Sequence, residues 1–454
     1  MENFVMTDSL RKKASSKIKL DILFVSDADS RLAQFRGEAA LKSVVRFYER
    51  VTDIKYTIAP SSKLATMTEK ELNDFNVLWL DNVSDFVSVM NLSNVLDRMI
   101  SAIDPQWKET AVSLSAEDKE KGNAYLKNLM KQRQEKIRVI YALDEFVWQA
   151  PISRAKEIKR VQIIESLMDL SDTVVVPNVD LADFIQKNEE ANWGGFVRED
   201  HDVRVIPTTV SPDFFPLYKD FRRTGVAGGI TEKPKVLIKG VTISENVQEF
   251  IMDNFKKMDI TICSVGSVNE HVMGLLQRKK VSHIMHWSHP HVNRRNMLDT
   301  LAIERDFEFD VVIHTKPDMG SLKGDVYEIT SGDDDILFSI ATGSIPICQT
   351  EHIGYDENHL SNVSGYVFDC DTPAKFLRGV IHSLCDVPVK FNEVYSKCKQ
   401  RADARAASSP EIMSMYFNVM VGPDLAEARR QISEEARIKM EEQEKLEQET
   451  TAAQ

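Results

Sequence analysis

The chain has 454 residues, of which 43% are hydrophobic and 28% are charged, with 18 glycines and 15 prolines. This length predicts two or three domains, and the composition excludes collagen-like and generally disordered proteins. The net charge of −13 at pH 7 disfavours a wholly basic nucleic-acid-binding protein.

Short apolar runs alternate with helical segments in the first half of the chain. The runs cover 20–26, 54–59, 75–80, 137–143, 172–177 and 203–207. A helix is expected over 32–50. This alternation indicates a parallel sheet covered on both faces. A polar, Lys-rich helical stretch over 105–135 interrupts it, and we interpret that stretch as an exposed insertion.

The same alternation restarts after a segment rich in Gly, charge and Pro at 221–234, which is typical of a linker. Strands are expected over 235–240, 259–265, 281–286, 310–314, 345–348 and 365–368, and helices over 245–257, 270–279, 294–305, 333–342 and 373–384. The fold class predicted is therefore α/β, with two tandem, Rossmann-like, doubly wound domains and a central cleft.

These patterns divide the chain into six parts. We expect a basic segment at 1–19, an N-terminal domain at 20–220, a linker at 221–234, a C-terminal domain at 235–390, helices at 391–422 that pack back towards the N-terminal domain, and a charged helical tail at 423–454.

The five cysteines are scattered and form no CxxC pair, which argues against a disulfide framework or a structural zinc site. No apolar run reaches the roughly 18 residues of a membrane span. The first residues lack the apolar stretch of a secretory signal. We therefore expect a cytoplasmic protein.

Several segments, always in the same order, resemble motifs of one enzyme family. These are Tyr141–Trp148, Asp172–Pro177 followed by Leu181-Ala182, Val203–Pro216, Asp335–Ile347 and Gly365–Asp369. Together they resemble nucleotide-sugar glycosyltransferases of the GT-B architecture, most of all the retaining members of family 4. The resemblance implies transfer of a sugar from a nucleotide-diphosphate sugar, UDP-sugar first among them, to a hydroxyl acceptor, with no obligatory metal.

Candidate site residues follow the strand ends, where open α/β sheets bind ligands. Lys239 and Lys316 are candidates for stabilising the departing diphosphate, and Asp144 and Glu145 for catalysis at the acceptor. The candidates for donor binding are Ser331, Gly332, Asp333, Asp334, Asp335 and Gly343; those for phosphate or acceptor contact are Ser30, Arg31, Arg36 and Arg294.

Ordinary structural roles compete with each of these assignments. Acidic residues cap helices, lysines and arginines lie on surfaces, and Gly343 fits a helix C′ position with positive φ. The histidines at 283, 286, 289 and 291 have a spacing that suggests a metal, but no carboxylate lies between them and strand alternation separates them. We expect no metal site.

A departure from the family leaves alternatives open. Its paired glutamates fall at Thr330 and Phe338 here. A catalytically degenerate GT-B protein acting as a binding or structural subunit is therefore the second hypothesis, and an epimerase of similar build is the third. The acceptor is equally open: a glycan, a protein, a small molecule or hydroxymethylated phage DNA, the last making the protein a DNA-modification enzyme.

Overall fold

A computed structural model describes the chain in segments between Lys12 and Glu434. The described residues are 12–13, 16–26, 37–49, 52–81, 83, 86–143, 146–147, 154–177, 179, 182, 202–207, 209, 233–240, 245–265, 278, 283–287, 309–315, 328–329, 336–337, 339–340, 342–349, 366–368, 372–404, 409–423, 425–427, 430–431 and 434. Apart from residue 278, the helices expected over 270–279 and 294–305 lie outside them, as does most of the predicted tail.

A six-stranded, wholly parallel sheet organises the first half of the chain, in the order β2-β1-β3-β4-β6-β7. Its strands are β1 (Ile18–Ser26), β2 (Thr52–Ala59), β3 (Val77–Asp81), β4 (Arg138–Ala142), β6 (Thr173–Val176) and β7 (Val203–Val205). Every residue of β3 is buried, because helices cover both faces. The predicted parallel sheet is confirmed.

The first sheet has two apolar faces, because successive side chains of a strand point to opposite sides. Ile22 and Phe24 of β1 pack with α3 and α18, whereas Leu23 and Val25 pack with α4, α6 and α9. The helices of this half are α3 (Gly37–Tyr48), α4 (Ser62–Thr66), α5 (Glu69–Leu72), α6 (Phe86–Ile103), α7 (Trp107–Glu117), α8 (Lys119–Lys136) and α9 (Arg154–Leu170); α18 (Pro410–Val421) joins them from the far end of the chain.

The stretch expected to be an exposed insertion consists of α7 and α8. The helical prediction is correct, but the stretch is not wholly exposed. Leu129 and Arg133 of α8 are buried. The guanidinium of Arg133 donates from Nη2 to Oδ1 of Asp172 at 2.7 Å. Because α8 leads directly into β4 and contacts it, its last turns belong to the body of this domain.

A second six-stranded parallel sheet follows, in the order β10-β9-β8-β11-β13-β14. Its strands are β8 (Lys235–Gly240), β9 (Asp259–Val265), β10 (His283–Trp287), β11 (Val311–Thr315), β13 (Ile345–Gln349) and β14 (Tyr366–Phe368). The chain builds outward from β8 in one direction and then returns to add β11 on its other side. The predicted α/β class with two doubly wound sheets is thus confirmed.

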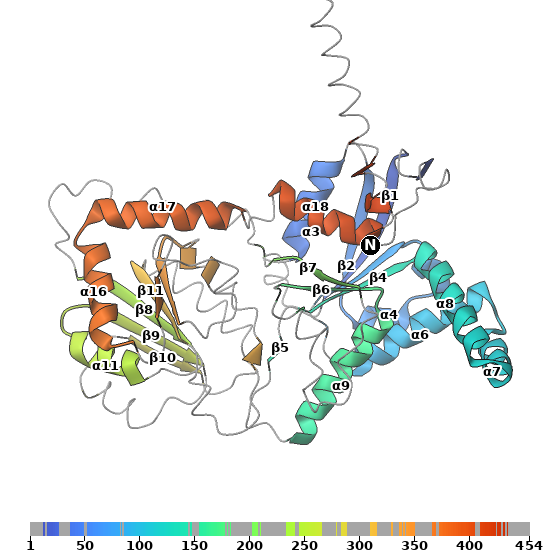
Figure 1. Ribbon diagram of the computed structural model, residues 1–454, viewed down its shortest axis with the longest axis horizontal. Helices are drawn as coiled ribbons and strands as arrows, with labels where there is room; N and C mark the ends of the chain where they lie inside the picture. The colour runs from blue at the N-terminus through green and yellow to red at the C-terminus, as the bar shows by residue number, and fades with distance from the viewer. Residues whose placement is uncertain are drawn as a thin grey trace, which may run out of the picture.

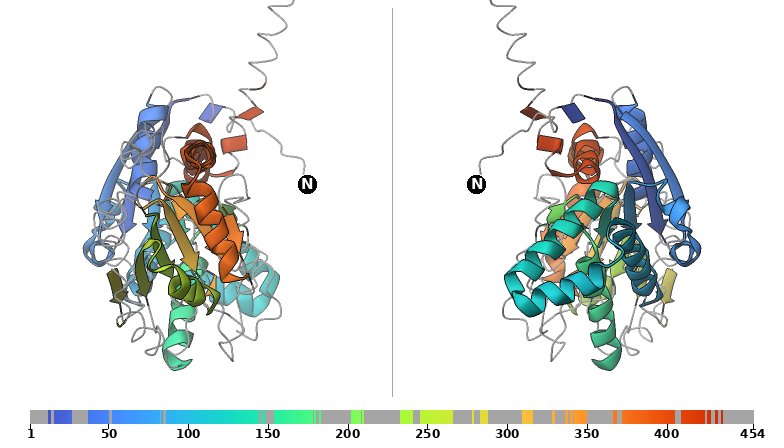
Figure 2. Two further views of the ribbon diagram at one scale, coloured as in Figure 1. Left: turned by 90° about the vertical axis from the view of Figure 1, so that its left-hand side faces the viewer. Right: turned by 90° about the vertical axis from the view of Figure 1, so that its right-hand side faces the viewer.

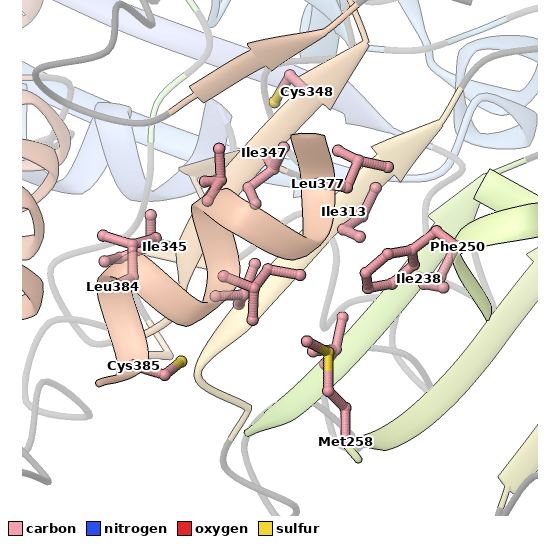
Figure 3. Packing of buried hydrophobic residues seen from close by; sticks show 14 of the residues in the cluster. Ile238, Phe250, Met258, Ile313, Ile345, Ile347, Cys348, Leu377, Leu384 and Cys385 are labelled. Carbon is pink, nitrogen blue, oxygen red and sulfur yellow. The ribbon is translucent and has the colours of Figure 1, made fainter. Parts of the chain in front are cut away.

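The core of the second domain lies between this sheet and the helices α11 (Glu245–Asn254), α16 (Ala374–Cys385) and α17 (Pro388–Ala404). Figure 3 shows Ile238, Ile313 and Ile347 of three neighbouring strands among the apolar side chains of this core. Leu377 and Leu384 of α16 face them, at the helical spacing that buries one stripe.

The last helices connect the two sheets. Phe391 and Tyr395 of α17 pack in the second core, whereas α18 packs on the first sheet. The rings of Trp79 and Tyr416 stack with centroids 5.3 Å apart. Figure 1 shows α17 running from the second sheet towards the first, and Figures 1 and 2 show α18 beside α3.

A short antiparallel ribbon also joins the two halves. β5 (Phe146–Val147) pairs with β12 (Glu328–Ile329). Phe146 follows the last residue of β4 by four positions, so it lies within about 14 Å of the carboxyl edge of the first sheet. A segment of the second half therefore reaches that edge, and Figure 1 shows β5 between the two sheets.

Within the described ranges, no helix combines the length and apolar character needed to span a membrane.

Candidate functional site

Each sheet has one place where its strand order reverses, and ligands of open α/β sheets bind beyond the carboxyl ends of the strands at that place. In the first sheet the reversal lies between β1 and β3. In the second it lies between β8 and β11. The polar residues at these two positions are therefore the candidate site.

Lys239 lies at the reversal of the second sheet. It is the last residue but one of β8, and only 6% of it is exposed. Its carbonyl oxygen accepts a hydrogen bond from Oγ1 of Thr315 on β11, at 3.1 Å. Lys239 is therefore a buried lysine at the place where open α/β sheets bind their ligands, and this position suits a group that meets a negatively charged ligand.

His314 is the register partner of Lys239 on β11 and is almost fully buried. Its Nε2 atom lies 3.2 Å from Oγ of Ser339, a hydrogen bond whose direction depends on the imidazole tautomer. Ser339 belongs to the segment expected to form the donor-site helix, of which the structure describes 336–337 and 339–340 as helical.

Gly343 ends this helix. Its φ is 92°, the left-handed conformation that glycine adopts without strain. The amide of Gly343 donates to the carbonyl of Ile340 at 3.0 Å, and the amide of Ser344 donates to that of Ser339 at 2.9 Å. This is a Schellman motif, so the predicted C′ position is confirmed. The predicted contact of Gly343 with a donor stays a prediction.

The reversal of the first sheet carries a buried carboxylate. Ser26 and Asp81 are register partners at the ends of β1 and β3, and Oγ of Ser26 donates to Oδ2 of Asp81 at 3.3 Å. Asp81 is 4% exposed. On its other side its register partner is Ala142 of β4.

Most residues predicted for the site lie outside the described residues. The catalytic candidates Asp144 and Glu145 follow Leu143, and Lys316 follows Thr315, so the chain places each just beyond a described strand. The other predicted residues outside the described ranges are Ser30, Arg31, Arg36, Arg294, Ser331, Gly332, Asp333, Asp334 and Asp335. Their roles stay predictions.

Four site residues were missed in the sequence: Ser26, Asp81, His314 and Ser339. A polar residue that ends a buried apolar strand was the available signal for Ser26, Asp81 and His314. Ser339 carried no such signal, because only the fold brings it to His314. Within the described part of the chain, no group of three or more His, Cys, Asp or Glu side chains is arranged to hold a metal ion.

No protein-family model and no curated protein matches the chain. Among solved structures, HepE from Anabaena, crystallised with UDP and glucose, is 13% identical and aligns over 92% of this chain and 99% of its own, with a TM-score of 0.43. A glycosyltransferase from Rickettsia africae ESF-5 is 12% identical over 90% of this chain and 98% of its own, with a TM-score of 0.48. Sucrose-phosphate synthase from Thermosynechococcus elongatus is 10% identical over 88% and 97%, with a TM-score of 0.47.

The Rickettsia structure is a glycosyltransferase by name, and HepE was crystallised with UDP and glucose.

Proposed function

We propose that the chain is a glycosyltransferase that moves a sugar from a nucleotide-diphosphate donor to a hydroxyl group. The second domain binds the donor and the first domain binds the acceptor. The observation that carries the proposal is the buried Lys239 at the strand reversal of the second sheet, in the domain whose motifs resemble the donor half of GT-B enzymes.

The chemistry assigned to Lys239 is electrostatic. As the glycosidic bond breaks, negative charge grows on the departing diphosphate, and a cation already fixed beside it lowers the barrier without reorganising. A site that excludes water strengthens this effect. Lys316, one residue beyond β11, is the second candidate cation. No protein residue has to form a covalent intermediate in this scheme, which fits retention by front-side displacement.

The first domain has the groups to orient an acceptor hydroxyl. Asp81 stands at its strand reversal, and Asp144 and Glu145 follow β4 two and three positions after Ala142. A carboxylate within hydrogen-bond reach of a hydroxyl orients it and accepts its proton. The pairing of β5 with β12 supports an approach of the second half to this edge of the first sheet.

The cysteines support a reducing compartment, and hence the cytoplasm. Cys348, Cys385 and Cys398 are buried as thiols and not as disulfides, as is usual where thiols are kept reduced. The acceptor is left as a glycan, a protein, a small molecule or hydroxymethylated DNA, each of which offers a hydroxyl. UDP is the first nucleotide to test because the resemblance of the sequence motifs implies a UDP-sugar as the donor.

The test is sugar transfer by mass spectrometry, with the chain incubated with pooled nucleotide sugars and candidate acceptors. Lys239→Ala is compared with Lys235→Ala, which removes a lysine from the other end of the same strand. We expect wild type and Lys235→Ala to transfer sugar, and Lys239→Ala to lose at least about 100-fold in rate. Donor binding without transfer would favour the degenerate subunit, and absence of both would exclude the proposal.

A further inference from the structure

Two buried polar side chains lie next to each other at the strand reversal of the second sheet. His314 and Lys239 are register partners on adjacent parallel strands, and both are buried. Register partners project to the same face, with their strands about 4.8 Å apart. The two side chains therefore project from neighbouring strands on the same face of the sheet, which puts the imidazole within reach of the aliphatic stem of Lys239.

His314 is held rigidly. Its Nε2 is bonded to Ser339 Oγ at 3.2 Å. Ser339 is fixed in turn by the Schellman motif, since its carbonyl accepts from the amide of Ser344 and from Oγ1 of Thr342. The neighbouring carbonyl of Ile340 accepts from the hydroxyl of Tyr395 on α17. The ring is thus tied to a turn that is itself tied to the core.

The backbone of Lys239 is fixed by the contact with Thr315 described above. A lysine side chain has a flexible four-carbon stem and loses much rotamer entropy when it meets a ligand in one geometry. A rigid ring beside that stem removes part of this freedom before the ligand arrives, which raises affinity by preorganisation.

We propose that His314, anchored by Ser339, is a positioning residue that holds the Lys239 ammonium in place for the diphosphate of the donor. The inference rests on the proposed function and deepens it. A histidine that serves only the core would contribute to stability, with no dependence of its effect on Lys239. Coupling between the two residues in ligand binding is therefore the distinguishing property.

The experiment is a double-mutant cycle on UDP affinity, measured by calorimetry on the full chain. The variants are Lys239→Ala, His314→Leu and the double variant. We expect His314→Leu to weaken UDP binding about tenfold in the presence of Lys239, and by less than about twofold in its absence. His314→Gln, which keeps a polar nitrogen near the place of Nε2, is expected to restore most of the affinity.

A matched pair of serines controls for stability. Ser339→Ala removes the anchor of His314 and is expected to act like His314→Leu. Ser344→Ala removes an equally buried hydroxyl, which is bonded to the carbonyl of Phe309 at 2.9 Å, and is expected to leave UDP affinity unchanged. If His314→Leu does not fold, the cycle is run with Ser339→Ala.

The inference would be overturned if the fold-losses of UDP affinity in Lys239→Ala and His314→Leu simply multiplied in the double variant. It would also be overturned if His314→Leu kept wild-type UDP affinity, or if Ser344→Ala lost as much UDP affinity as Ser339→Ala. These results leave the proposed function standing, because wild type and Lys239→Ala still differ. If the wild-type chain bound neither UDP nor any nucleotide sugar, the proposed function would be excluded, and the inference with it.

Discussion

Ser26 and Asp81 form a buried hydrogen bond between the ends of β1 and β3, where the first sheet reverses its strand order. The second sheet has its own pair of polar register partners at the equivalent place, Lys239 and His314. The first pair contains an anion suited to a hydroxyl, and the second a cation suited to a phosphate. This difference in charge supports the proposed assignment of the acceptor to the first domain and the donor to the second.

Asp81→Asn separates the acceptor role from the donor role. The change keeps the size of the side chain and removes its negative charge. We expect the rate of sugar transfer to fall about 100-fold or more, with UDP affinity unchanged, because the proposed nucleotide site lies in the other domain. Transfer assays and calorimetry on the same preparation measure both. A loss of UDP affinity with unchanged turnover would contradict the assignment.

Two glycines give opposite predictions for stability. Gly422 ends α18 with a φ of 87°, and a Cβ there would lie 2.8 Å from Nη1 of Arg138. Gly422→Ala is expected to destabilise the protein by about 1–3 kcal/mol.

Gly379 lies exposed within α16, and no atom beyond its own helix backbone and chain neighbours lies within 4 Å of the place that a Cβ would take. Gly379→Ala is accordingly expected to stabilise the protein by about 0.5–1 kcal/mol, because alanine loses less backbone entropy in a helix. Urea unfolding of the two variants beside wild type measures both effects. If the two substitutions changed the free energy of unfolding in the same direction, backbone conformation would not be what determines stability at these positions.

The ion pair between Arg133 and Asp172 is buried, with 5% and 2% of the two side chains exposed. Breaking such a pair leaves a buried charge without its partner. Asp172→Ala is expected to cost about 3–5 kcal/mol of unfolding free energy. The control is Asp97→Ala, which breaks an exposed pair with Lys108 and is expected to cost less than about 1 kcal/mol. Equal losses in the two variants would contradict the prediction.

Tyr125 of α8 makes stability depend on pH. Its hydroxyl donates to Oδ2 of Asp104 at 2.6 Å, and this bond lowers the pKa of Asp104 and raises that of Tyr125. A carboxyl whose pKa is lower in the folded state stabilises it above the unfolded pKa of about 3.9. That contribution is lost as the pH falls through the folded pKa.

Wild type is therefore expected to be more stable than Tyr125→Phe at pH 7, with a gap that narrows below about pH 4. Because the pKa of Tyr125 is raised in the folded state, the extra stability of wild type is also expected to be lost as the pH rises above about 10. Denaturant unfolding of both proteins across this range measures the gap. A gap that stays constant from pH 7 to pH 3 would contradict the linkage.

The strands were predictable because buried parallel strands form continuous apolar runs, such as Val77–Leu80 and Val311–Ile313, bounded by polar residues. The left-handed Gly343 was predictable for a related reason: a glycine after a helical pattern, with Pro346 soon after, is typical of a C′ position.

Strand order and register were not predictable from local pattern. His314 and Ser339 are separated by 25 residues and Arg133 and Asp172 by 39, so nothing in their immediate neighbourhoods indicates the contact. β5 and β12 are two residues long, too short for any periodicity to predict them. Asp81 was visible as a strand end, but its importance depends on β3 lying beside β1 at the reversal.

Hydrogen exchange in the presence and absence of UDP tests most directly whether the strand reversal of the second sheet holds the donor. We expect UDP to slow exchange in the peptides that contain Lys239 and His314, and to leave those containing Lys235 and Asp81 unchanged. Protection confined to the peptides of the first domain, or protection at the amino end of β8 in place of its carboxyl end, would contradict the account.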